Sequence, residues 1–202
     1  LAQAEVVINP YAEKPSTRER SPASINRDMT ALKAALNFAH DHGHVDSDNA
    51  WRLALKPIKN ATRRRETYLS AEERRRLLGA MQDDIKPMVQ AMTLLPFRPA
   101  VFARLIVGDF DQRQAVLRVE RDKKAKDRYV PLPKETAALL EKNCTGKPPS
   151  GFVFVDRNGN PWNKDSWKKA FKGAAKVADL PETVTAYTLR HSVITDLISL
   201  HD

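Results

Sequence analysis

A basic segment at residues 57–68 divides the sequence into two parts that are expected to fold as separate domains. Three consecutive arginines stand within it, Arg63, Arg64 and Arg65. The segment lacks an apolar period, so it predicts a linker between residues 1–56 and residues 69–202. The triple arginine has two interpretations, a solvated hinge or a clamp along a phosphate backbone. The interdomain position favours the clamp, because a duplex held between two domains passes close to their linker.

The N-terminal part predicts half of a small helical bundle. Residues 1–20 carry prolines and alternating charges without a sustained period, which predicts an extended or poorly ordered lead-in. Ser21-Pro22 is typical of a helix start, and apolar residues at helical spacing follow until Gly43 ends the helix. A second short helix is expected over 49–55. Two helices of this size bury little, so they are expected to be completed by a segment upstream or to dock on something else.

The C-terminal part alternates helical patterns with short β-branched segments. Helices are expected to start at the capping box Ser70-Ala-Glu-Glu73 and to cover 85–95, 133–143 and 163–177, with a last one beginning near Thr188. Strands are expected over 115–120, 128–132 and 152–155, with a turn at 107–111. The predicted fold class is mainly α with a small antiparallel β-sheet, an α+β architecture.

Composition indicates a globular protein with a polyanionic partner. The formal net charge is +9 over 202 residues, and both sides of the linker contribute to it. The single cysteine, Cys144, excludes internal disulfides and fits a reducing compartment. No apolar run approaches the length of a membrane helix, and the N-terminus is not a signal peptide. Because the first residue is not methionine, the chain is expected to start inside a longer gene product.

Three groups of residues carry candidate chemistry. The stretch from Thr183 to Ser192 places Tyr187, Arg190 and His191 where a loop turns into a helix. With Arg190 in the first helical turn, its guanidinium and the free backbone N–H groups would form a phosphate-binding arrangement. Two prolines are expected to hold Arg98 at a fixed orientation between two helices. The polar connection of the predicted hairpin carries three lysines, Lys123, Lys124 and Lys126.

Four sequence boxes in this order resemble the tyrosine recombinases, also called phage integrases. They are Leu94-Leu-Pro-Phe-Arg-Pro99, Leu105-Ile-Val-Gly-Asp-Phe-Asp111, Lys123-Lys-Ala-Lys-Asp-Arg-Tyr-Val-Pro-Leu132 and Thr188-Leu-Arg-His-Ser192. Each box alone is also compatible with an ordinary structural role. Their shared order favours the family from about residue 21 to residue 202. The resemblance implies part of a core-binding domain, followed by a catalytic domain.

The resemblance also implies roles for individual residues. Arg98 and Arg190 would hold the nonbridging oxygens of a scissile DNA phosphate, and Lys123 would protonate the leaving 5′-oxygen. Lys124 or Lys126 fits the acid position equally well in a shifted register, and both are otherwise expected to contact DNA. Tyr187 takes a supporting hydrogen-bonding position, whereas His191 is expected to pack or to contact DNA from beside the site. The family needs neither a metal nor a nucleotide cofactor.

Three positions depart from the family pattern. Val101 replaces an acidic residue, Leu95-Pro96 replaces Thr-Gly, and no tyrosine stands in the nucleophile's context before Asp202. The expectation is a recombinase fragment without its nucleophile that binds double-stranded DNA, forms tetramers on DNA when intact, and works in the cytoplasm of a bacterium at the nucleoid, whether chromosomal or phage-encoded. Alternatives are a non-catalytic integrase-derived DNA-binding protein and an unrelated basic nucleic-acid-binding protein. Wide spatial separation of Arg98, Lys123 and Arg190 would favour the unrelated nucleic-acid-binding protein.

Overall fold

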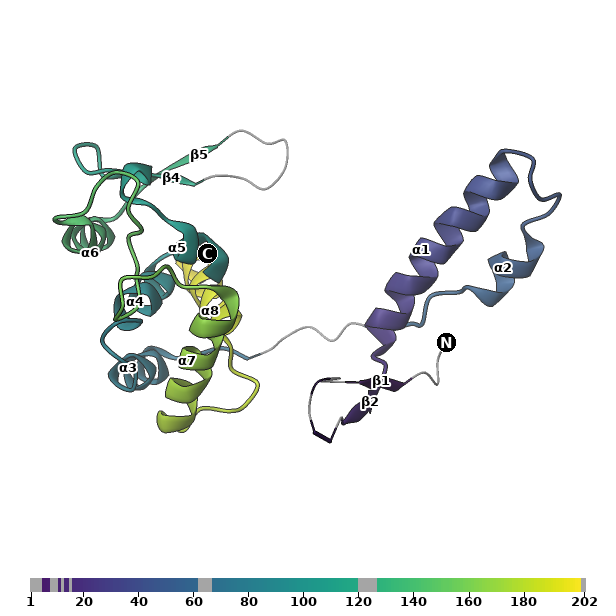
Figure 1. The fold of residues 1–202 in the computed structure, drawn as a ribbon, viewed down its shortest axis with the longest axis horizontal. Helices are drawn as coiled ribbons and strands as arrows, with labels where there is room; N and C mark the ends of the chain where they lie inside the picture. Colours follow the sequence, from purple (N-terminus) through teal and green to yellow (C-terminus); the bar gives the residue numbers. More distant parts are fainter. Residues whose placement is uncertain are drawn as a thin grey trace. The chain divides into compact units, whose positions relative to one another are not determined.

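The computed structural model describes residues 5–7, 11, 13–14, 16–61, 67–119 and 127–200. They belong to two compact units, Leu1–Arg65 and Glu66–Asp202 (Figure 1). Helices dominate both, and two small antiparallel sheets accompany them, so the predicted fold class is confirmed. Within the described ranges, no helix is both long enough and apolar enough to cross a membrane.

The first unit contains the two predicted helices. Helix α1 (Pro22–Asp41) is capped by Ser21, and helix α2 (Asn49–Ala54) lies along it (Figure 1). The indole Nε1 of buried Trp51 donates to Asn37 Oδ1 at 2.8 Å, which fixes α2 on α1. Gly43 follows α1 with φ of +71°, a left-handed conformation that favours glycine.

The N-terminal lead-in is more regular than predicted. Strand β1 (Glu5–Val7) pairs antiparallel with β2 (Thr17–Glu19), with Val6 opposite Arg18. The segment was predicted to be extended or poorly ordered; these six residues are extended, and their pairing was not predicted because a three-residue strand is too short to show an alternating pattern. Only Val6 is even partly buried among the six paired residues, so the pair buries little apolar surface.

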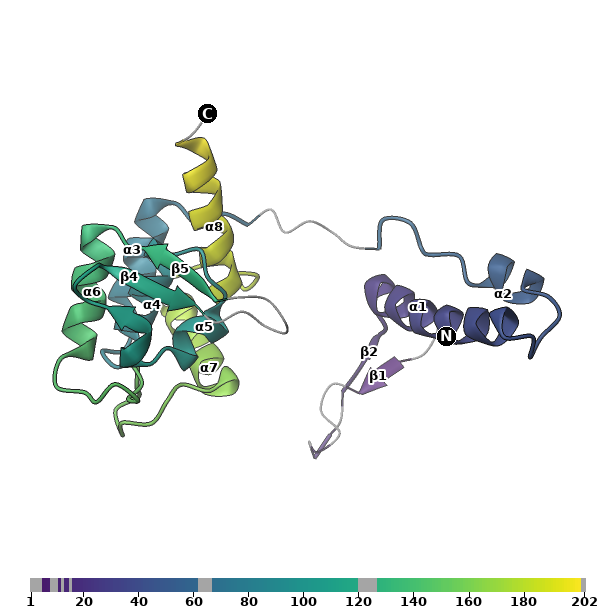
Figure 2. The same cartoon turned by 90° about the horizontal axis from the view of Figure 1, so that it is seen from above.

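Helix α4 (Lys86–Leu94) is the central element of the second unit. Four of its nine residues are buried, and it packs against α3 (Ala71–Gly79), α5 (Pro99–Arg104), α6 (Lys134–Cys144) and α8 (Ala186–Ser199) (Figure 2). The predicted capping box at the start of α3 is present: Ser70 Oγ accepts the N–H of Glu73 at 3.2 Å, and the Glu73 carboxylate accepts the N–H of Ser70 at 2.8 Å.

A three-stranded antiparallel sheet covers one side of this helical core. It runs in the order β3 (Phe110–Asp111), β4 (Val116–Val119) and β5 (Arg128–Pro131). The two predicted strands at β4 and β5 are confirmed. The turn predicted at 107–111 is instead a 3-10 turn, η1 (Val107–Asp109), followed by β3, because backbone pairing with β4 recruits residues that carry no strand pattern of their own.

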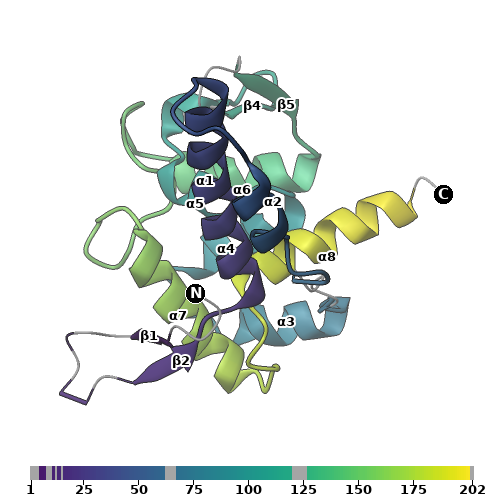
Figure 3. The same ribbon diagram turned by 90° about the vertical axis from the view of Figure 1, so that its right-hand side faces the viewer.

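Helix α7 (Lys164–Val177) completes the unit and corresponds to the helix predicted over 163–177, with Asn163 as its N-cap. The strand predicted over 152–155 was wrong: Phe152 and Val155 form only single bridges, to Ile106 and Pro161. Val153 and Phe154 between them are buried, so this apolar segment fills the core without joining a sheet. In Figure 3, α8 extends from among the other helices of this unit toward the C-terminus.

Candidate phosphate-binding site

The bend between α4 and α5 sets the position of Arg98. Leu95 leaves α4 with extended backbone angles, φ −124° and ψ 133°, and Arg98 is the N-cap of α5 with φ −68° and ψ 142°. Pro99 pre-sets the first helical position and is buried, while Phe102 anchors α5 in the core at 1% exposure. The backbone of Arg98 is therefore fixed, and its side chain is exposed.

Helix α8 begins earlier than predicted. Thr185 is its N-cap, and the backbone N–H of Thr185 donates to Thr188 Oγ1 at 3.0 Å. Helix geometry then puts Tyr187 in the first turn and Arg190 in the second. The predicted alignment of Arg190 with the free N–H groups of the first turn was therefore wrong. The Thr185–Thr188 hydrogen bond and the burial of Ala186 pull the helix start forward.

The structure joins the two arginine boxes directly. Arg190 Nε donates to the backbone carbonyl of Pro96 at 3.0 Å, across 94 positions of sequence. Arg98 lies only two residues beyond Pro96, so its Cα is within about 7 Å of the Pro96 Cα. The guanidinium of Arg190 and the backbone of Arg98 therefore lie at one short bend.

Both arginines keep hydrogen-bond donors available. Nε of Arg190 is satisfied by Pro96, whereas its two terminal amino groups have no partner among the described residues. The Arg98 side chain likewise has no hydrogen bond or ion pair within the described chain. A guanidinium presents its donors in a planar fork that matches the oxygens of a phosphate. Two such forks can bind one phosphate without a metal.

The valine at position 101 partly explains why Arg98 has no ion pair within the described residues. Val101 lies three residues after Arg98 and is half-buried, packing against the hydrophobic core. Its side chain cannot pair with a cation, so α5 offers Arg98 no carboxylate from this position.

The other candidates in the last box lie beside this pair. Tyr187 is half-buried in the first turn of α8, and His191 is exposed next to Arg190. Neither side chain forms a hydrogen bond within the described residues. Their supporting roles therefore stay predictions.

The remaining predicted cations lie outside the described residues. These are Lys123, Lys124 and Lys126 of the hairpin connection, and Arg63, Arg64 and Arg65 of the predicted linker.

The base of the lysine-bearing hairpin is held by ion pairs. Arg118 on β4 donates to Asp109 Oδ1 from Nη2 at 2.7 Å and from Nε at 3.2 Å, and Arg118 Nη1 lies 3.8 Å from Asp127 Oδ2. The hydrogen bond to Asp109 raises the pKa of Arg118 above its ordinary value, so this residue stays charged.

A second network, which the sequence did not suggest, holds the other side of α8. Asp196 accepts a hydrogen bond from Tyr68 Oη at 2.7 Å and pairs with Arg74 Nη1 at 2.6 Å. The Arg74 hydrogen bond lowers the pKa of Asp196, and the hydrogen bond to Asp196 raises the pKa of Tyr68. Local patterns could not reveal this network, because 128 positions separate Tyr68 from Asp196.

Helix α7 presents a face of exposed lysines. Trp167 and Phe171 are buried in the core, and four of the five exposed lysines recur every four residues, so they form a stripe along the helix beside its buried side. These lysines are Lys164, Lys168, Lys169, Lys172 and Lys176.

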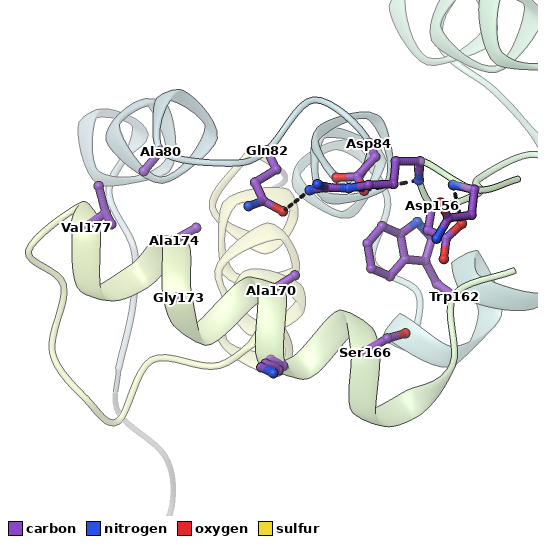
Figure 4. A pocket seen from close by; sticks show the side chains of 13 residues that line it. Ala80, Gln82, Asp84, Asp156, Trp162, Ser166, Ala170, Gly173, Ala174 and Val177 are labelled. Carbon is purple, nitrogen blue, oxygen red and sulfur yellow. Dashed lines mark hydrogen bonds and ion pairs between the residues drawn. The ribbon is translucent and has the colours of Figure 1, made fainter. Parts of the chain in front are cut away.

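A pocket of about 560 Å³ between α7 and the end of α3 is separate from the arginine pair. Figure 4 shows Ala170, Gly173 and Ala174 of α7 on one side of it and Gln82 and Asp84 on the other. None of the predicted site residues that the structure describes lines it. A search of the described residues for three His, Cys, Asp or Glu side chains that could share a metal ion found none.

Comparison with known proteins gives a consistent result. The family model described as "Phage integrase family" matches residues 67–200. The chain is 27% identical over 181 residues to a tyrosine recombinase of Thermosipho africanus, covering 87% of the chain and 62% of that protein. It is 32% identical over 194 residues to tyrosine recombinase XerD of Listeria monocytogenes, covering 89% of the chain and 64% of that protein. The chain thus spans less than two thirds of the length of these relatives.

Solved structures show the same fold. An integrase of the Tn1549 transposon, in complex with transposon right end DNA, matches with a TM-score of 0.76 and 19% identity, over 91% of this chain and 69% of that one. A lambda integrase dimer bound to a COC' core site matches with a TM-score of 0.70 and 17% identity, over 89% of this chain and 71% of that one.

Sulfate binding tests the arginine pair without DNA. Sulfate stabilises any folded protein by exclusion from its surface, so the informative quantity is the difference between variants. A specific site adds about 1.4 kcal/mol when sulfate is at ten times its dissociation constant. We expect the increase in melting temperature with sulfate to be smaller in Arg98→Gln and Arg190→Gln than in the wild type and in the control Arg104→Gln. Equal increases in all four proteins would contradict a shared anion site.

The lowered pKa of Asp196 predicts a pH window for its contribution to stability. A carboxyl group whose folded pKa is depressed stabilises the fold above its unfolded pKa, and this stabilisation is lost as the pH falls through the folded pKa. We expect Asp196→Asn to lower the free energy of unfolding by about 1 kcal/mol at pH 7, since the pair is partly exposed. The difference in the free energy of unfolding between the wild type and Asp196→Asn should shrink below about pH 4. Urea unfolding at both pH values measures it, and a pH-independent difference would contradict this assignment.

Proposed function

Since the chain belongs to the phage integrase family, we propose that it is part of a site-specific DNA recombinase and supplies the phosphate-binding half of its active site. The intact enzyme breaks one DNA strand through a 3′-phosphotyrosine and rejoins it to a partner strand. The observation that supports the proposal is the 3.0 Å hydrogen bond from Arg190 Nε to the carbonyl of Pro96, two residues before Arg98, which leaves the terminal amino groups of Arg190 without a partner among the described residues.

The arginine pair stabilises the transition state of phosphoryl transfer. When a tyrosine oxygen attacks the phosphorus atom, the pentacoordinate phosphorane carries more negative charge on its nonbridging oxygens than the diester does. Arg98, on the fixed backbone of the bend, and Arg190, held by Pro96, bind these oxygens more strongly at that stage. The bond between phosphorus and the 5′-oxygen breaks, and Lys123 protonates the leaving oxygen. Tyr187 donates a supporting hydrogen bond to the same phosphate.

The nucleophile is supplied from outside residues 1–202. The four tyrosines of the sequence are Tyr11, Tyr68, Tyr129 and Tyr187. Tyr68 Oη already donates to Asp196, and Tyr187 takes the supporting position. The attacking tyrosine follows residue 202, as it follows the corresponding box in the family that the sequence resembles.

Double-stranded DNA is the proposed partner, bound mainly through its phosphates. The net charge of +9 and the exposed lysine face of α7 support this. Arg63, Arg64, Arg65, Lys124, Lys126 and His191 extend the same contact. The Tn1549 and lambda integrases of similar fold were solved in complex with DNA, the latter as a dimer. The intact protein forms a tetramer on DNA and acts in the cytoplasm, associated with the nucleoid.

A second candidate is a non-catalytic DNA-binding protein derived from an integrase. Val101 favours it, because this side chain cannot supply the carboxylate that the family pattern places three residues after the first arginine. The coding sequence beyond codon 202 decides between the two: a Gly-His pair followed by a tyrosine supports the recombinase.

Binding to a mixed-sequence duplex tests the phosphate site. Hydrogen bonds to charged groups contribute about 1.5–3 kcal/mol, so Arg98→Gln and Arg190→Gln should each weaken binding roughly tenfold or more. Removal of one cation from a phosphate should also reduce the slope of log K against log salt by about 0.9. Fluorescence anisotropy at several salt concentrations measures both quantities. Arg98→Lys and Arg190→Lys are the matched controls, since they keep the charge and should weaken binding less.

The missing nucleophile predicts binding without cleavage. Incubated with a nicked suicide duplex, the 202-residue polypeptide should form no covalent adduct that survives denaturing electrophoresis. A polypeptide extended through the next tyrosine of the gene should form one and lose it when that tyrosine is changed to phenylalanine. An adduct with the 202-residue chain would overturn the assignment of the nucleophile.

A further inference from the structure

Helix α8 makes polar contacts with other parts of the second unit on two different sides. Arg190 faces Pro96 on one side. At 3.6 residues per turn, Ser192 and Asp196 project about 160° and 120° away from Arg190. They lie one turn apart, and both contact the short segment Tyr68-Leu69, at the C-terminal end of the predicted linker.

The inner contact is fully buried. The backbone N–H of Leu69 donates to Ser192 Oγ at 2.9 Å, and Ser192 Oγ donates to the carbonyl of Thr188 at 2.9 Å. Leu69 is 1% exposed and Ser192 is 0% exposed. A buried backbone N–H without an acceptor costs about 1–3 kcal/mol, so the segment is bound to this turn of α8.

Arg74 of α3 closes the outer contact. Its Nη1 lies 2.6 Å from Asp196 Oδ2, and its Nε donates to the carbonyl of Leu69 at 2.9 Å. The guanidinium carbon also lies 5.5 Å from the centre of the Tyr68 ring, within cation–π range. Tyr68 Oη donates to the other oxygen of Asp196 at 2.7 Å. One carboxylate thus holds a tyrosine from the segment and an arginine from α3.

These hydrogen bonds fix the orientation of α8, which apolar packing alone does not do. Leu189 and Val193 are buried on α8, but contacts between aliphatic side chains depend weakly on direction. Hydrogen bonds lose strength steeply when their angles change, so they fix the rotation of the helix and its position along its axis. A binding arginine has to be held within about 0.5 Å of its productive position.

We propose that Tyr68, Arg74 and Asp196 are positioning residues for Arg190, and that the segment leaving the linker sets the orientation of the helix that carries this arginine. The inference rests on the proposed function, in which Arg190 binds a DNA phosphate. None of the three residues contacts the DNA itself.

A double-mutant cycle tests the inference on the full chain, with a fluorescein-labelled mixed-sequence duplex as the probe. Asp196→Asn and Tyr68→Phe are each measured alone and combined with Arg190→Ala. We expect Arg190→Ala to weaken binding about tenfold. Asp196→Asn and Tyr68→Phe should each weaken binding severalfold when Arg190 is present and leave it unchanged when Arg190 is absent, because residues that act through one group are not additive.

The control is Asp84→Asn, which removes the same charge from another ion pair of the second unit, with Arg157. Loss of a negative charge favours DNA binding in general, so this variant should not weaken it. Tyr68→Phe changes no charge and keeps the Arg74–Asp196 pair, so it tests the positioning role even if the Asp196→Asn variant is unfolded. Melting temperatures show which variants are folded at the temperature of the assay.

The outcomes separate the two proposals. Suppose that Arg190→Ala weakens binding, but that Asp196→Asn and Tyr68→Phe either have no effect or weaken binding by the same factor with and without Arg190. The positioning role is then overturned and the proposed function stands. If Arg190→Ala leaves binding unchanged, the proposed function fails, and the positioning role fails with it.

Discussion

The hydrogen bond from Arg190 Nε to the carbonyl of Pro96 is the contact on which the candidate site depends. A carbonyl next to a proline-rich bend has no helical partner to satisfy it, so it is free to accept a donor from a distant helix. Using Nε for this contact leaves both terminal amino groups of Arg190 for a ligand. The same contact brings Arg190 close to Arg98, and the central helix α4 supports both, because it packs against α5 and α8.

Holding two cations near each other has an energetic cost that the fold has to meet. Two like charges at one bend repel each other, and within the described chain no carboxylate pairs with either arginine. The burial of Phe102 on α5 and Leu189 on α8 fixes the two backbones despite this repulsion. In the proposed function, a bound phosphate removes this repulsion, and the apolar core supplies the preorganisation that lets the site favour an anion.

The sequence predicted most helices and both main strands, because amphipathic periods, Ser and Asn caps and Pro and Gly boundaries are local signals. It misplaced features that depend on distant partners. The start of α8, strand β3 and the buried segment 152–155 are set by tertiary contacts. The candidate arginines came from the resemblance of sequence boxes, whereas the Arg190–Pro96 contact and the Tyr68–Asp196 network came only from the structure. Those contacts join segments 94 and 128 positions apart, and no local pattern encodes such a separation.

Charge alone cannot select the phosphate that reacts. A net charge of +9 and a lysine face on α7 attract every phosphate of a duplex almost equally, since a lysine ammonium acts as a point charge. Discrimination requires donors with fixed directions, and Arg190 has such donors because its Nε is bound to the carbonyl of Pro96. In the proposed function, general electrostatic binding therefore brings DNA to the protein, and the two guanidinium groups select the phosphate at which the chemistry takes place.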